Sequence, residues 1–166
     1  MNETLIQALI DVLRQEEHAL TDLTATFLAQ ETAFAKNRLD VLEQITRRQE
    51  DLRTAVGEFE KQRVVYTMQL AVALGCEETI TLSVVADRLG GEWGTLLHNL
   101  RKQLMTLSQE VKDAGENTVF LLTYSVKTVD HLLRILTGTK GTGPIYSRLG
   151  KVSTPSGHRS IINHEV

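Results

Sequence analysis

The stretch from Trp93 to Thr137 carries one unbroken helical pattern, and its length constrains the fold more than any other feature of the sequence. Its stripe positions recur every three or four residues in strict alternation, which is the a and d spacing of a helix that packs along a neighbour. These positions are Trp93, Leu97, Leu100, Leu104, Leu107, Val111, Ala114, Thr118, Leu121, Ser125, Thr128, Leu132 and Ile135. A helix of this length far exceeds the roughly 11–12 residues of an average helix, so it requires partner helices.

Two further stripes with the same alternation precede the long one. They run through Ile6, Leu9, Leu13, Glu16, Leu20, Leu23, Phe27, Gln30 and Phe34, and then through Leu42, Ile45, Gln49, Leu52, Val56, Phe59, Arg63, Tyr66 and Leu70. Glu16 and Gln30 are the polar interruptions of the first stripe, and we expect them to fix the register of packing rather than to form a site. Because none of these helices can bury its stripe alone, the sequence predicts an all-α fold. We expect an antiparallel bundle of three long amphipathic helices plus one short helix.

Four residues bear on where these helices begin, end or weaken. Asn37 is suited to cap the second helix, and Gly75 is suited to end it. Thr81 is suited to cap the short helix, which we expect over residues 82–89. Gly57 lies inside the second helix, where it costs about 1 kcal/mol relative to Ala, and the surrounding packing has to offset this cost.

Residues that break helices are concentrated after Thr137, where both prolines and five of the eleven glycines lie. This predicts a helical bundle domain of residues 1–137 and a flexible tail of residues 138–166. The tail contains one short apolar cluster around a tyrosine, a pattern typical of docking peptides that become ordered on their partner. The cluster comprises Ile145, Tyr146, Leu149 and Gly150. The alternative is that this cluster folds back onto the bundle as a cap.

The charge distribution argues against nucleic acid as a partner. The formal net charge is −3, and residues 1–137 carry 14 basic and 20 acidic side chains, whereas phosphate binding requires clustered Lys and Arg. The single cysteine, Cys76, cannot form an internal disulfide, and no signal-peptide pattern opens the chain. We therefore expect a cytoplasmic protein, with no membrane span because no run of about 18 apolar residues occurs.

No constellation of catalytic or metal-binding residues is evident in the sequence. A di-iron site in a helical bundle requires Glu three residues before His, and none of the five histidines follows an acidic residue at that spacing. One cysteine excludes the thiolate zinc patterns. The glycines between Gly138 and Gly143 lack the Walker spacing of a phosphate-binding loop. We therefore expect neither an enzyme nor a bound metal or cofactor.

The second half of the long helix has a wider apolar face than the first half. A second stripe is wholly apolar there, through Val119, Leu122, Val126, Val129, Leu133 and Leu136. The matching earlier positions are mostly polar, namely Arg101, Met105, Ser108 and Lys112. Up to about Ala114 we therefore expect the helix to have a single packing seam and a scaffold role. The wide face is too wide for a single seam. Either this end of the helix contacts two neighbours at once, or part of the face binds a partner.

The layout of the chain up to about Gly150 resembles the flagellar export chaperones of the FlgN family, which serve the hook-associated proteins at the hook–filament junction. The resemblance rests on the two long N-terminal amphipathic helices and on the short helix that begins Thr81-Leu82-Ser83. It rests further on Asn117 before Leu121-Leu122 and on the ending Tyr146-Ser147-Arg148-Leu149-Gly150, which is similar to the Tyr-x-x-x-Gly tail of the family.

The resemblance implies a function and two binding surfaces. Such chaperones bind the C-terminal helical segments of their cargo, prevent premature assembly in the cytoplasm and deliver the cargo to the export gate at the membrane. The stripe from Val119 to Leu136 is then the expected cargo-binding face, in the helix-in-groove mode. Ile145, Tyr146, Leu149 and Gly150 are then the expected contacts with the export gate.

A structural coiled-coil or scaffold protein is the alternative function. In such a protein every stripe is covered by the helices of the same chain or by a second copy, and the regular heptads and missing catalytic groups fit this reading. Burial of Val119, Leu122, Val126, Val129 and Leu133 within one chain would favour the scaffold. An exposed apolar stripe also favours self-association when no cargo is bound.

Overall fold

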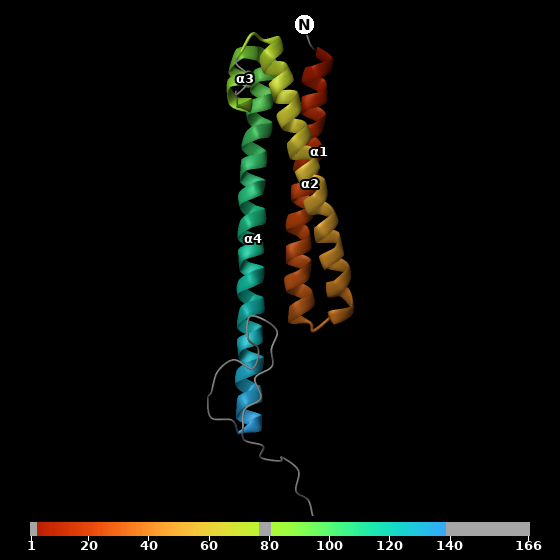
Figure 1. Cartoon of the computed structure of the whole chain (residues 1–166), viewed down its shortest axis with the longest axis vertical. Coiled ribbons are helices and arrows are strands. Elements are labelled where there is room, and N and C mark those ends of the chain that lie inside the picture. The colour runs from red at the N-terminus through yellow and green to blue at the C-terminus, as the bar shows by residue number, and fades with distance from the viewer. Residues whose placement is uncertain (1–2, 77–80, 139–166) are drawn as a thin grey trace, which may run out of the picture. The chain divides into compact units, whose positions relative to one another are not determined.

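The computed structural model describes residues 3–76 and 81–138 of the 166-residue chain (Figure 1). It contains four helices, which are α1 (Glu3–Ala35), α2 (Leu39–Ala73), α3 (Leu82–Leu89) and α4 (Gly91–Thr137). No strand occurs in these residues, so the predicted all-α fold with three long helices and one short helix is confirmed. The chain divides into two compact units, Met1–Val119 and Phe120–Val166, and α4 contributes to both. The expected boundary between a helical domain and a tail at residue 138 adjoins residues outside the described ranges and stays a prediction.

The core of the first unit combines side chains from all four helices. Seven large side chains at its centre are less than 2% exposed, namely Ile6, Leu9, Ile10, Leu13, Leu70, Val85 and Leu97. A smaller cluster of Ala19, Leu23 and Leu52 extends the packing between α1 and α2. None of the stripe positions predicted for these two helices is exposed. Since burying one such apolar side chain contributes about 1.5–3 kcal/mol, these clusters supply the main force that holds the first unit together.

Two polar pairs connect α1 with α2, which run antiparallel (Figure 1). Arg63 Nε donates to Glu16 Oε2 at 2.9 Å, and Gln49 Nε2 donates to Gln30 Oε1 at 2.9 Å. Fourteen residues separate Glu16 from Gln30 and fourteen separate Gln49 from Arg63, so both pairs fit one antiparallel register. A slip by one helical turn would break both pairs, at about 1–3 kcal/mol for each buried polar group left without a partner. These contacts support the expectation that Glu16 and Gln30 fix the register.

The expected role of Asn37 as the cap of the second helix is wrong. Its φ of 53° is left-handed, and it ends α1 instead. The Arg38 N–H donates to the Ala33 carbonyl at 2.9 Å and the Asn37 N–H donates to the Phe34 carbonyl at 3.0 Å, which is the Schellman pattern. Asn adopts this conformation more readily than most residues because its short polar side chain bonds locally. The residue before α2 is Arg38, and it makes no side-chain capping bond.

Gly75 ends α2 as predicted. Its φ is 68°, and the Cys76 N–H donates to the Ala71 carbonyl at 2.9 Å, so the chain leaves the helix through a left-handed glycine. Thr81 occupies the N-cap position of α3 as predicted, but its side chain makes no capping hydrogen bond. Residues 77–80 of the expected loop lie outside the described residues.

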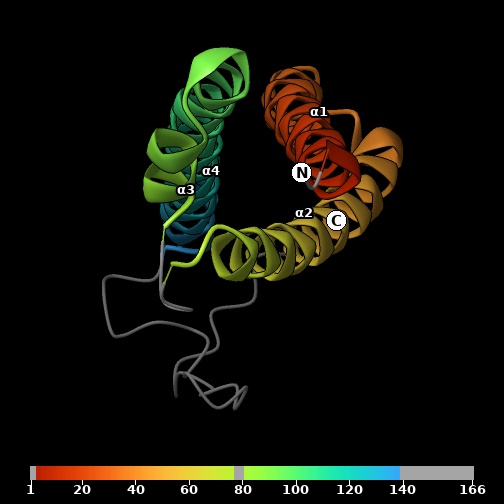
Figure 2. The same ribbon diagram turned by 90° about the horizontal axis from the view of Figure 1, so that it is seen from above.

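Gly94 determines how closely α3 approaches α4, and the sequence reasoning missed it. A Cβ added to Gly94 would lie 2.5 Å from the Ala86 carbonyl oxygen, a distance that no side chain can occupy. Figures 1 and 2 both show α3 beside the first turns of α4. Gly90 and Gly91, with φ of 61° and 55°, turn the chain between the two helices. Gly94 is therefore needed for the packing of α3 against α4 and not for local flexibility.

Two glycine substitutions should have opposite effects on stability. Gly94→Ala should lower the free energy of unfolding by about 1–3 kcal/mol, because α3 has to move away from the new methyl group. Gly57→Ala should raise it by about 0.5–1 kcal/mol, because Ala favours the helix and a Cβ at Gly57 would meet no atom within 4 Å. Urea denaturation followed by circular dichroism measures both changes. A Gly94→Ala protein as stable as Gly57→Ala would contradict the close packing of α3.

Candidate functional site

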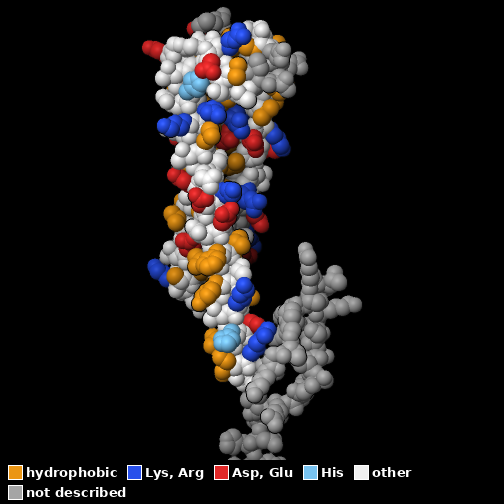
Figure 3. Space-filling model, turned by 90° about the vertical axis from the view of Figure 1, so that its left-hand side faces the viewer, with side chains coloured by type: hydrophobic (Ala, Val, Ile, Leu, Met, Phe, Trp, Pro, Cys, Tyr) orange, Lys and Arg blue, Asp and Glu red, His pale blue; other side chains and the backbone are white. Residues whose placement is uncertain are grey.

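The predicted cargo-binding residues lie along the C-terminal part of α4. Five of the six are exposed, with exposed fractions of 63% for Val119, 67% for Val126, 55% for Val129, 49% for Leu133 and 73% for Leu136. Leu122 is partly buried. Figure 3 shows hydrophobic side chains on the surface of α4 towards its C-terminal end. We call these six residues the C-terminal apolar face.

Exposed apolar side chains extend well beyond the predicted stripe. Phe120, Leu121, Tyr124, Leu132 and Ile135 are also exposed. At 100° per residue, the apolar positions of residues 119–136 cover an arc of about 260°, interrupted by isolated polar residues. A continuous polar strip remains only at Thr123, Lys127, Asp130 and Arg134. Phe120 and Tyr124 belong to neither of the two predicted stripes, although their positions around the helix follow from the sequence.

The predicted contacts with the export gate cannot be placed on the structure. Ile145, Tyr146, Leu149 and Gly150 lie outside the described residues. Their assignment therefore rests on the sequence pattern and stays a prediction.

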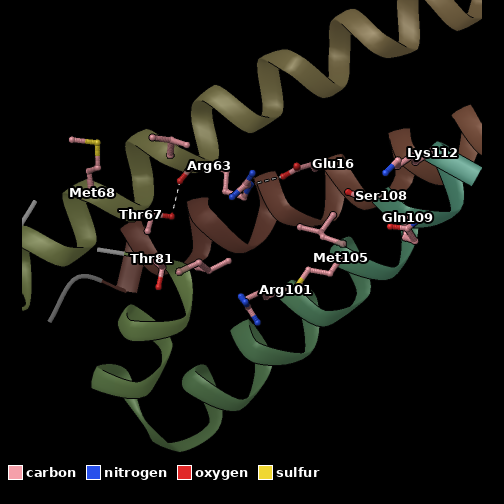
Figure 4. Close-up of a pocket in the computed structure, with 13 residues that line it drawn as sticks. Glu16, Arg63, Thr67, Met68, Thr81, Arg101, Met105, Ser108, Gln109 and Lys112 are labelled. Carbon is pink, nitrogen blue, oxygen red and sulfur yellow. Dashed lines mark hydrogen bonds and ion pairs between the residues drawn. The ribbon is translucent and has the colours of Figure 1, made fainter. Parts of the chain in front are cut away.

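A groove in the first unit is lined in part by α4 residues that the sequence predicted to be scaffold (Figure 4). Its volume is about 630 Å³. It is lined by Glu16, Arg63, Val64, Thr67, Met68, Thr81, Leu82, Arg101, Leu104, Met105, Ser108, Gln109 and Lys112. The four early positions of the second α4 stripe, from Arg101 to Lys112, are therefore groove residues. We call this feature the α2–α4 groove.

Glu16 and Arg63 form a largely buried ion pair at the base of the α2–α4 groove. The side chain of Glu16 is 8% exposed and that of Arg63 is 26% exposed. Burial raises the pKa of the Glu16 carboxyl above its ordinary value, and the charge and hydrogen bond of Arg63 offset only part of this effect. Glu60, whose carboxylate lies 3.6 Å from the Arg63 guanidinium, also acts to raise the pKa of Glu16. The carboxylate has a structural role, because its hydrogen bond is made to a neighbouring helix.

Neither a metal site nor a membrane-spanning helix is found in residues 3–76 and 81–138. No three His, Cys, Asp or Glu side chains of these ranges gather closely enough to hold a metal ion. None of the helices described contains an apolar stretch long enough to cross a bilayer.

The raised pKa of Glu16 predicts a pH-dependent contribution to stability. The folded protein holds this proton more tightly than the unfolded chain, so the contribution of Glu16 is most favourable at low pH and decreases as the carboxyl ionises. The stability of the natural protein relative to Glu16→Gln should therefore fall as the pH rises from about 4, where a Glu carboxyl ordinarily titrates, towards neutral. Urea denaturation of both proteins across this range measures the difference. A pH-independent difference between the natural protein and Glu16→Gln would contradict the assignment.

Comparison with known proteins identifies a family that the chain matches. The family model described as FlgN protein matches residues 1–154. Comparisons with curated proteins and with solved structures gave no match. The family match covers all four helices and continues beyond the end of α4, which is well over half of the chain. The chain therefore belongs to the FlgN family of flagellar export chaperones.

Proposed function

We propose that this protein is a cytoplasmic chaperone for hook-associated flagellar proteins. It binds their C-terminal helical segments, prevents premature assembly and delivers them to the export gate. Family membership supports the general function. The observation that carries the specific proposal is the exposed C-terminal apolar face of α4.

The chemistry of this face suits a helical cargo. Its residues follow the spacing of three and four that an amphipathic helix presents to a groove or to another helix. Exposed apolar patches of this kind on soluble proteins commonly mark protein-binding sites. Full burial of one such side chain contributes about 1.5–3 kcal/mol, and part of this gain is offset by the ordering of the cargo. The cargo-binding residues that we propose are Val119, Leu122, Val126, Val129, Leu133 and Leu136.

The tail supplies the second proposed contact. Ile145, Tyr146, Leu149 and Gly150 form a short apolar cluster in a segment otherwise rich in Gly, Ser, Thr and Pro. A cluster of this kind suits recognition by a partner that orders it on binding. We assign these residues to a component of the export gate, so that cargo and gate use different parts of the chain.

The scaffold alternative predicts that a second copy of the chain covers the C-terminal apolar face. Val119, Val126, Val129 and Leu133 are exposed among the residues that the structure describes. A scaffold function would need these residues to be buried against another copy, whereas a chaperone would self-associate through them only without cargo. The two functions therefore differ in whether added cargo dissociates the oligomer, which light scattering measures.

Two Asp substitutions in the C-terminal apolar face should abolish cargo binding. In Val126→Asp/Leu133→Asp, the two carboxylates would have to be buried against an apolar cargo helix. Each costs several kcal/mol without a partner, so affinity should fall by at least about 100-fold. Isothermal titration with a C-terminal helical segment of a hook-associated protein from the same organism measures this change.

The matched control is Thr106→Asp/Thr123→Asp, which adds the same two charges to polar positions of α4. It should bind cargo within about threefold of the natural protein, since surface substitutions usually change free energies by less than 0.5 kcal/mol. Circular dichroism should show that both double variants keep their helices. Unchanged cargo affinity of a folded Val126→Asp/Leu133→Asp protein would exclude this face as the binding site.

Tyr146→Ala should separate delivery from binding. Loss of the ring removes the largest apolar contact of the tail cluster, so affinity for the export gate should fall, whereas cargo affinity should stay the same. Secretion of hook-associated proteins in cells tests delivery to the export gate. Cargo titration with the purified variant tests cargo affinity. A loss of thermal stability in the variant would instead indicate that the tail caps the bundle.

A further inference from the structure

The α2–α4 groove combines apolar walls with positive charge, and the proposed chaperone function does not use it. Figure 4 shows Arg101 and Met105 of α4 on one side of the groove and Thr67 and Met68 of α2 on the other. All of its lining residues belong to the first unit.

The walls of the groove offer apolar surface that water can reach. Val64 is 47% exposed, Met68 is 41% exposed and Met105 is 58% exposed, whereas Leu82 and Leu104 beneath them are buried. Methionine adapts to irregular partners because its side chain is unbranched and polarizable. The groove can therefore receive apolar side chains of different shapes without rearrangement of the helices.

The groove is positively charged on an acidic protein. Its lining contains three cations, Arg63, Arg101 and Lys112, and a single acid, Glu16, which is already bonded to Arg63. Arg101 has no ion-pair partner among residues 3–76 and 81–138, and Lys112 Nζ lies 4.0 Å from the exposed carboxylate of Glu116. By contrast, the whole chain has a net charge of −3. The local excess of positive charge is complementary to an acidic partner.

We infer that the α2–α4 groove is a second protein-binding surface, which accepts an amphipathic helix with apolar side chains next to a carboxylate. The apolar side chains contact Met68 and Met105, and the carboxylate pairs with Arg101, whose guanidinium is suited to bidentate binding of carboxylates. Arg101 and Lys112 are eleven residues apart, or roughly 16 Å along α4. A partner helix of about three turns therefore spans the groove. The cations that line the groove are too few for binding to a nucleic acid backbone.

The methionines allow a direct test of this inference. Two of the three methionines of the chain, Met68 and Met105, line the groove, so methyl-labelled methionine gives a nuclear magnetic resonance signal from each wall. The probe is a synthetic 15-residue helical peptide of Leu, Ala, Gln and Glu, with Leu at helical spacing and Glu beside the Leu stripe. Its partner peptide replaces every Glu with Lys. The Glu peptide should shift both methionine signals saturably, and the Lys peptide should bind at least about tenfold more weakly.

A pair of variants locates the charge contact. Arg101→Glu should weaken binding of the Glu peptide by about fivefold or more, because it replaces an attraction with a repulsion. Lys102→Glu makes the same charge change at the next residue of α4, which is exposed and lies outside the groove lining, and it should change affinity by less than about twofold. The comparison of the two peptides uses the natural protein, so it does not depend on the folding of a variant.

Several results would overturn the inference. Met68 and Met105 signals that do not respond, equal affinity for the two peptides, or equal effects of Arg101→Glu and Lys102→Glu would each exclude a charge-selective groove. Peptide binding that is lost in Val126→Asp/Leu133→Asp and kept in Arg101→Glu would place the peptide on the C-terminal apolar face. Failure of the groove test would leave the proposed cargo binding intact, since that binding is measured with different residues and a different ligand.

Discussion

The arrangement of the first unit depends on the register between α1 and α2, and two polar pairs define it. Glu16 bonds to Arg63, and Gln30 bonds to Gln49. Apolar contacts alone would tolerate a slip by one turn, because Leu, Val and Phe recur at the same spacing along both helices. Buried polar groups do not tolerate it, since a slip would separate Glu16 from Arg63 and Gln30 from Gln49. The pairs therefore select one alignment, and the apolar clusters supply most of its stability.

The same ion pair also shapes the α2–α4 groove. Arg63 is held by Glu16, so its charge is largely neutralised, and the positive character of the groove comes from Arg101 and Lys112 on α4. The core that seats α4 is concentrated near its start, at Leu97, Leu100 and Leu104. The neighbouring stripe of α4, from Arg101 to Lys112, lines the α2–α4 groove. Packing of α3 through Gly94 fixes this first part of the helix.

The two surfaces of the protein have different chemistry and so suit different partners. The C-terminal apolar face of α4 has hydrophobic side chains and few charges, which suits the apolar side of an amphipathic helix. The α2–α4 groove has methionine walls and cations, which suits an acidic helix.

The sequence by itself determined the helices and their buried stripes, the end of α2 at Gly75, and the apolar excess at the end of α4, because each depends on local periodicity and on local backbone preference. It did not determine that Glu16 meets Arg63, or that Gln30 meets Gln49, because periodicity says which side of a helix is buried and not which residues face each other. Asn37 suits either end of a helix locally, and only the hydrogen bonds at the end of α1 decided between them. The roles of Gly94 and Arg101 likewise came from the tertiary structure, since close packing and a groove exist only between helices.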